Sequence, residues 1–246
     1  MKNRLFKLLI LLLSVFGCSA CFDLQENLFL KKDGSGTFSF IVSLGDLKSM
    51  MSMFEMGKSD NNPEKSTRTK KSSNEKLSNN FESTRKKLMK IDGISNVKTI
   101  EDTINNKFGL SFNFKNVEVL NNAMNRLFED DTATEKSPDI VYFQWKDNRL
   151  IRNEEIDSKS IIGKSGDFTK DTKKSSETLL PFSLDQLFGS VSYSSSYEFE
   201  NKITESVNPN AELSSNKKKV TIKCYPFAAE KDSTKQKCTI ANTISF

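Results

Sequence analysis

Apolar and polar residues alternate along several short stretches of the chain, which is the pattern of strands with one buried face. The stretch "NLFLKKDGSGTFSFIVSL" carries two such runs around "KKDGSG", and it predicts a hairpin over residues 27–44. The runs over residues 97–104 and 108–114 predict a second hairpin, whose second arm is rich in phenylalanine. A third hairpin is predicted over "IVYFQWKDNRLIR", with its turn at Asp147 and Asn148.

Apolar residues recur at helical spacing in three other stretches. The first lies behind Asp46, a residue suited to cap a helix, and it carries Leu47, Met50, Met51 and Phe54. The second covers residues 77–91 and ends at Gly93, while the third covers residues 117–128 behind a cap at Asn116. Hairpins that alternate with helices predict an α+β fold, in which an antiparallel sheet built from hairpins has one face covered by helices.

The N-terminal segment has the features of an export signal. Lys2, Arg4 and Lys7 accompany an apolar run that ends at Phe16, and this run is too short for the roughly 20 apolar residues that cross a membrane. We therefore expect residues 1–17 to be a signal peptide that is removed.

The mature chain is then expected to be one exported α+β domain over residues 18–246. Two stretches of this domain, near residues 57–75 and 157–178, are almost entirely polar. Because such sequences bury little apolar surface, both are predicted to be flexible insertions. Residues 191–246 return to the alternating pattern and predict further strands.

Two cysteines follow the signal segment in "SVFGCSAC". Val15 and Gly17 before Cys18 resemble the lipobox of bacterial lipoproteins, in which the cysteine is acylated and becomes the first mature residue. Cys21 is the second choice for lipidation, and cleavage to a soluble secreted product is the third alternative. Acylation with two or three chains, for example palmitate, would hold the protein at a membrane because each buried methylene contributes about 0.8 kcal/mol.

The charge of the mature chain argues against a nucleic-acid partner. Removal of residues 1–17 takes away three basic residues and no acidic one, so the formal net charge falls from +5 to +2. A chain so close to neutral attracts phosphate only weakly over long distances.

The other two cysteines, Cys224 and Cys238, lie at equal distances from Lys231. The strands "KKVTIKCYPF" and "KCTIANTISF" on either side predict a hairpin that places the two thiols opposite each other. Outside the cytoplasm such a pair is expected to form a disulfide, which contributes about 3 kcal/mol in the loop-entropy view. A metal site is the rival interpretation, but it lacks ligands because the chain contains no histidine.

The absence of histidine also excludes a Ser-His-Asp or Cys-His nucleophile and a histidine general base. Spacings of the form S-x-x-K occur at Ser73, Ser83 and Ser214 among other positions, and so many matches are expected by chance in a chain rich in serine and lysine. "IIGKSGD" lacks the first glycine of a phosphate-binding loop. We therefore expect no catalytic activity, no metal and no cofactor.

The lipobox, the strand leading into "KKDGSG", the methionine-bearing helix and the run "KITESVNPNAELSSNKKKVTIK" together resemble the LppM-type envelope lipoproteins of mycobacteria. This resemblance implies an exported α+β domain in the bacterial cell envelope, lipid-anchored to a membrane, with a cavity for lipid or another apolar molecule. It implies no catalytic residue.

Two functions are compatible with these features. In the first, the protein acts as a scaffold or docks another envelope protein on its outer surface. In the alternative, aromatic and methionine side chains line an apolar pocket between sheet and helices that binds or carries a lipid. The pocket would be lined by Phe38, Phe40, Met50, Phe112 and Phe114. The first function is preferred because a sheet covered by helices needs such residues for packing alone.

Overall fold

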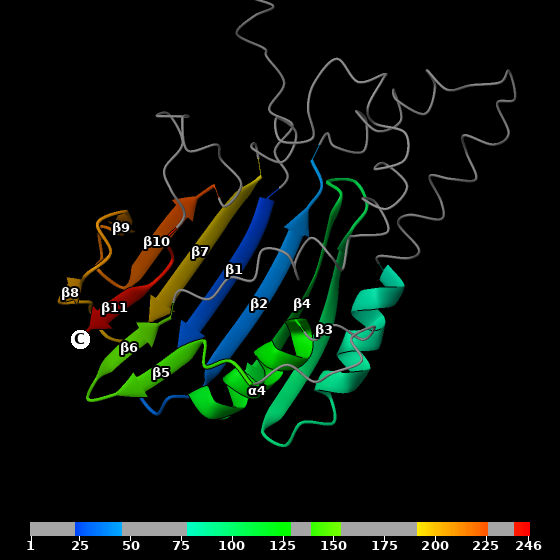
Figure 1. The fold of residues 1–246 in the computed structure, drawn as a ribbon, viewed down its shortest axis with the longest axis horizontal. Coiled ribbons are helices and arrows are strands. Elements are labelled where there is room, and N and C mark those ends of the chain that lie inside the picture. Colours follow the sequence, from blue (N-terminus) through cyan, green and yellow to red (C-terminus); the bar gives the residue numbers. More distant parts are fainter. Residues whose placement is uncertain (1–22, 46–77, 129–138, 154–190, 226–238) are drawn as a thin grey trace, which may run out of the picture.

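The computed structural model describes residues 23–45, 78–128, 139–153, 191–225 and 239–246 (Figure 1). These residues form two sheets and two helices. The larger sheet contains, in spatial order, β3 (Ile94–Asp102), β4 (Lys107–Phe114), β2 (Gly36–Ser43), β1 (Asp23–Leu30), β7 (Ser192–Phe199), β10 (Lys219–Cys224) and β9 (Ala211–Leu213). The smaller sheet contains β5 (Phe143–Lys146), β6 (Arg149–Arg152), β11 (Asn242–Ser245) and β8 (Glu205–Ser206). The helices are α4 (Val117–Phe128) and a helix over residues 78–88.

The three predicted hairpins are present, and their turns use the residues that the sequence indicated. β1 pairs antiparallel with β2 across a turn in which Gly34 has a φ of 80°. β5 pairs with β6 through Asp147 and Asn148, whose φ values of 53° and 56° suit a two-residue hairpin turn. β3 pairs with β4, and Asn106 in their turn also has a positive φ. Local turn chemistry therefore determines these pairings.

The α+β fold class is confirmed, but one pair of strands departs from the expected antiparallel arrangement. β1 and β7 lie side by side and run parallel, so the larger sheet is mixed. Asp23 and Ser192 are neighbours in this pair although 169 residues separate them in the chain. No turn can specify a pairing of this kind, because parallel neighbours are joined only by long connections.

The predicted hairpin around Lys231 is wrong. β10 pairs with β7 and β9 in the larger sheet, whereas β11 pairs with β6 and β8 in the smaller sheet. Both strands have the predicted alternation, but alternation specifies a buried face and not a partner. Each strand therefore has two other neighbours, and the chain changes sheets between them.

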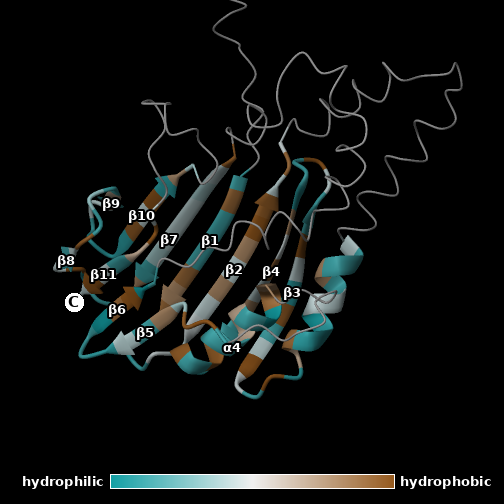
Figure 2. Ribbon diagram, in the orientation of Figure 1, coloured by the Kyte–Doolittle hydropathy of each residue, from teal (hydrophilic) through white to brown (hydrophobic). Residues whose placement is uncertain are grey.

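Only one face of the larger sheet, here called the inner face, is covered by described elements. Hydrophobic and hydrophilic residues alternate along its strands (Figure 2), and most of the hydrophobic ones point to this inner face. The helices cover the half formed by β2 and β4, where Phe128 of α4 meets Phe40 edge to face with ring centroids 5.3 Å apart. The smaller sheet covers the half formed by β1 and β7, where Phe143 meets Tyr197 at 5.9 Å.

The cap predicted for the helix over residues 117–128 is present. The backbone N–H of Val119 donates to the side-chain oxygen of Asn116 at 2.9 Å, so Asn116 caps α4 as expected. The buried residues of α4 are Val117, Leu120, Ala123, Met124 and Leu127.

The predicted helix behind Asp46 and the polar stretches near 57–75 and 157–178 lie outside the described residues. Within the described part, neither helix is long and apolar enough to span a membrane.

Candidate functional site

The four phenylalanines predicted to line an apolar pocket all lie on the inner face. Phe38, Phe40, Phe112 and Phe114 are buried, each with at most 4% of its surface exposed, in one cluster with residues of α4. The rings of Phe38 and Phe112 lie 5.5 Å apart. Met50 lies outside the described residues, so the pocket itself stays a prediction.

The predicted cysteine sites are only partly described. Cys224 is fully buried at the end of β10. Its predicted disulfide partner, Cys238, lies outside the described residues, as do Cys18 and Cys21, so the disulfide and the lipidation stay predictions. No group of three potential metal ligands occurs among the described cysteine and acidic residues.

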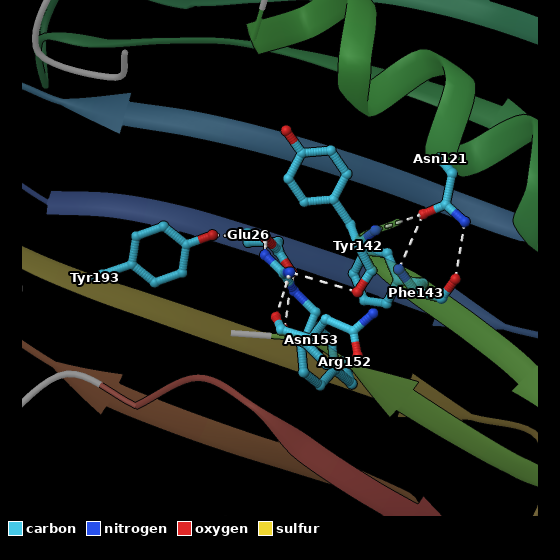
Figure 3. A network of polar contacts seen from close by, with 8 residues as sticks. Glu26, Asn121, Tyr142, Phe143, Arg152, Asn153 and Tyr193 are labelled. Carbon is cyan, nitrogen blue, oxygen red and sulfur yellow. Dashed lines mark hydrogen bonds and ion pairs between the residues drawn. The ribbon is translucent and has the colours of Figure 1, made fainter. Parts of the chain in front are cut away.

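A buried charged cluster joins the two sheets at the middle of the inner face (Figure 3). Glu26 of β1 has no exposed surface, and Arg152 at the end of β6 is 2% exposed. The Arg152 guanidinium donates through Nε to Glu26 Oε1 at 3.3 Å and through Nη2 to Oε2 at 3.1 Å. This two-bond geometry is the strong form of an arginine–carboxylate pair.

Two tyrosines of β7 complete the shell of donors around Glu26. Tyr193 donates its hydroxyl to Oε2 at 2.5 Å, and Tyr197 donates to Oε1 at 2.8 Å. Tyr193 and Tyr197 lie an even number of positions apart on β7, so both side chains lie on the inner face, beside β1. Each carboxylate oxygen of Glu26 therefore accepts two hydrogen bonds, which offsets the cost of burying its charge.

Arg152 is satisfied from its other side by the backbone of the smaller sheet. Its Nη1 donates to the carbonyl oxygen of Asn153 at 2.8 Å. The guanidinium also lies over the ring of Phe143, 4.8 Å from the centroid, and 5.5 Å from the centroid of Tyr142. Contacts of a cation with aromatic faces are favourable when the cation is removed from water.

The cluster shifts the pKa values of its members in directions that keep it intact. Burial alone would lower the pKa of Arg152, but the adjacent Glu26 carboxylate outweighs it and the pKa is raised. Burial, and then the negative charge of Glu26, raise the pKa of Tyr193 and of Tyr197 well above the usual value. Arginine thus stays charged and both tyrosines stay neutral donors.

Two asparagines of α4 attach the smaller sheet to the helix layer. Asn121 donates from Nδ2 to the carbonyl oxygen of Phe143 at 2.8 Å, and its Oδ1 accepts the backbone N–H groups of Tyr142 and Phe143. One helical turn later, Asn125 bonds the N–H and carbonyl of Ile140 in the same manner. Asn121 thus takes the place of a neighbouring strand at the start of β5 (Figure 3). Asn125 does the same for the segment just before β5.

This buried cluster suits a structural role and not catalysis. Both charged groups are removed from solvent and bonded to the protein, so neither is available to a substrate. Ser195, beside Glu26 on β7, has a buried hydroxyl with no hydrogen-bond partner among the described residues. The hydrogen bonds of the cluster hold the smaller sheet against the larger one.

The opposite face of the larger sheet, here called the outer face, is covered by no described helix or strand. Strand register places one polar side chain from every strand in a single line across it, here called the Asn27 row. The row consists of Lys98, Ser111, Ser39, Asn27, Ser196, Thr221 and Glu212. A shallow depression of about 180 Å³ lies over its centre, lined in part by Asn27, Phe29, Ser39 and Ser196.

Sequence reasoning missed both features, although the buried charged cluster left a signal. Glu26 occupies an inward position between Leu24 and Leu28 in an otherwise regular alternation, and Arg152 follows Leu150 in the same phase. A charged residue at an inward position requires a partner in the core. The partner could not be identified from sequence because 126 residues separate the two.

No family model matches the chain, and no curated protein matches it. Among solved structures, the chain is similar to the NMR structure of the folded domain of the Mycobacterium tuberculosis LppM protein. The similarity covers 91% of this chain and 87% of that chain, with 7% sequence identity and a TM-score of 0.36.

Proposed function

We propose that the protein is a bacterial envelope lipoprotein, anchored to a membrane through acylated Cys18, that acts without catalysis by docking a partner on the outer face. The observation that carries this proposal is the difference between the two faces of the larger sheet. The inner face is covered by described elements and held by the buried cluster, whereas the outer face carries the Asn27 row and a shallow depression.

The anchor is supported by the sequence of the first residues. The basic tip, the short apolar run and the residues before Cys18 have the pattern of a lipoprotein signal. A protein held by two or more acyl chains needs no apolar surface of its own to stay at the membrane. Its folded domain is then free to present a polar surface, which agrees with the composition of the Asn27 row.

A matched pair of photo-crosslinkers tests the docking part of the proposal. A photoreactive amino acid is placed at Ser39 on the outer face and, as the control, at Asn122, an exposed residue of α4. The full chain is irradiated in intact cells. We expect adducts with an envelope component from Ser39 and none from Asn122. Equal labelling from both positions, or none from Ser39, contradicts docking on the outer face.

Metabolic labelling with a palmitate analogue tests the anchor. Replacement Cys18→Ser is expected to abolish incorporation and release the protein from the membrane fraction. Labelling that persists until Cys21 is also replaced shows that the acylated residue is Cys21. The lipid-carrier alternative would appear instead as saturable uptake of a fluorescent fatty acid by the purified protein, with no dependence on Ser39.

A further inference from the structure

We propose that the partner docked on the outer face is a neutral polysaccharide, bound as an extended chain along the Asn27 row with one sugar ring over Phe29. This inference rests on the proposed function, because it uses the same face. It names the chemistry of the partner from three properties of that face: the spacing of its polar groups, its charge balance and an aromatic residue in its depression.

The spacing of the Asn27 row suits a linear glycan. Hydrogen-bonded strands lie about 4.8 Å apart, so the seven side chains of the row are regularly placed over about 29 Å. The spacing of about 4.8 Å between neighbouring side chains of the row is close to the length of one pyranose ring along an extended glycan chain. All seven carry a hydroxyl, an amide, an amine or a carboxylate, which are the groups that bond sugar hydroxyls.

Cross-strand hydrogen bonds hold the polar side chains of this face in fixed positions. Asn27 Nδ2 donates to Ser39 Oγ at 3.2 Å, and Thr37 Oγ1 donates to Asn113 Oδ1 at 3.0 Å. A primary amide has two N–H donors and an acceptor oxygen, so one such bond leaves Asn27 further capacity for a ligand. Groups that are already ordered lose less entropy when they bind.

The charges on the outer face balance. The residues that register places on this face include four lysines and four acidic residues in the described strands. They are Lys98, Lys107, Lys219, Lys223, Asp23, Asp102, Glu198 and Glu212. A face without excess charge offers no field to attract a nucleic acid, an anionic headgroup or a charged protein patch. Neutral polar partners remain, and a glycan is the one that presents hydroxyls at regular intervals.

The depression supplies the apolar contact that such ligands need. Phe29 is half-buried within it, next after Asn27 among the outward residues of β1, and its neighbours on β2 and β7 are Thr37 and Glu198. The C–H face of a pyranose can pack on an aromatic ring while its hydroxyls bond the surrounding side chains. A volume of about 180 Å³ accommodates one sugar unit and no more. The neighbouring units would then lie along the row.

Isothermal titration of the detergent-solubilised full-length protein with a hexasaccharide of β-1,4-linked N-acetylglucosamine tests the inference. We expect saturable binding with one site per chain. Phe29→Ala is expected to raise the Kd about tenfold, because the aromatic contact is lost. Ser39→Gln, which fills the depression without removing a core side chain, is expected to raise it at least as much. Asn122→Ala on α4 is the control and should leave the Kd unchanged.

Two outcomes overturn the inference, and they separate it from the proposed function. If neither this hexasaccharide nor the corresponding glucose hexamers with β-1,4 and α-1,4 links bind, the glycan inference fails. It also fails if binding persists unchanged in Ser39→Gln. If the Ser39 crosslinker nevertheless captures an envelope protein at that face, the docking function stands with a different partner. If the Ser39 position captures nothing, both fail together.

Discussion

Arg152 and Glu26 are joined by two hydrogen bonds of 3.3 Å and 3.1 Å across the interface between the two sheets, although 126 residues separate them in the chain. One comes from the last position of β6 and the other from the centre of β1. A buried pair of this kind contributes little net stability compared with apolar residues of similar volume. Its geometry instead fixes how the smaller sheet sits on the larger one.

Arg152→Met should lower the free energy of unfolding by about 3–5 kcal/mol, because it leaves the Glu26 carboxylate buried without its cation. Urea unfolding of the full-length protein measures this. The double replacement Glu26→Leu with Arg152→Met should recover a large part of the loss. Arg149→Met is the control, since Arg149 is exposed on the same strand, and it should stay within about 0.5 kcal/mol. A double variant as unstable as the single one contradicts this account of the pair.

Tyr193 and Tyr197 should remain protonated in the folded protein at a pH where ordinary tyrosines ionise. Burial and Glu26 raise both pKa values in the folded state, whereas the unfolded value is about 10. Their contribution to stability is therefore complete below about pH 10 and is lost as the pH rises further, because unfolding releases the protons. Phenolate absorbance, followed with and without urea, measures this. Four tyrosines that titrate alike in the native protein would contradict it.

Asn121→Ala should lower the free energy of unfolding by about 1–3 kcal/mol, since it leaves backbone groups of Tyr142 and Phe143 without their partner. Asn122→Ala, an exposed change on the same helix, is the matched control and should have almost no effect. Hydrogen exchange at the Phe143 amide should accelerate in the first variant alone. Unchanged exchange there would show that the asparagine does not hold the edge of β5.

Ser195→Ala should raise the free energy of unfolding by about 1 kcal/mol. Its hydroxyl is buried with no hydrogen-bond partner among the described residues, so its removal relieves a desolvation cost without breaking a bond. Ser196→Ala, the same change on the outer face, should be close to neutral. A loss of stability in the first variant would indicate that the hydroxyl bonds an internal water.

The hairpins were predictable because turn residues specify them over a few positions. Asp147 and Asn148 adopt the positive φ values that a tight hairpin requires, and Gly34 does the same between β1 and β2. Asn116 likewise caps α4 through a bond to a residue three positions away. Turns and caps depend on residues that are close together in the chain, so they can be recognised from a short stretch of sequence.

The arrangement of these units was not predictable in the same way. The parallel pairing of β1 with β7 and the separation of β10 from β11 into two sheets depend on contacts between distant segments. Alternation identifies the buried face of each strand but is equally compatible with either sheet. The Asn27 row has the same origin, since its members are aligned only once the strand order is known.

Phe112→Ala is the last prediction, and it separates a packed core from a ligand pocket. Phe112 is 1% exposed and lies with Phe38, Leu120 and Met124 in one buried cluster. In a fully packed interior its truncation should cost about 3–5 kcal/mol, because a cavity is left that the sheet and α4 cannot close. Phe29→Ala, the same truncation on the outer face, should cost much less, since Phe29 is half-buried there.

An apolar pocket would give a different result in the same experiment. A pocket wall is packed on one side only, so the loss on truncating Phe112 would fall well below the core value. The purified protein would also take up a fluorescent fatty acid at a saturable site, and Met50→Trp would block that uptake while the fold survives. Urea unfolding and the uptake assay together therefore decide the role of the inner face. A full core loss without uptake leaves the outer face as the surface on which a partner docks.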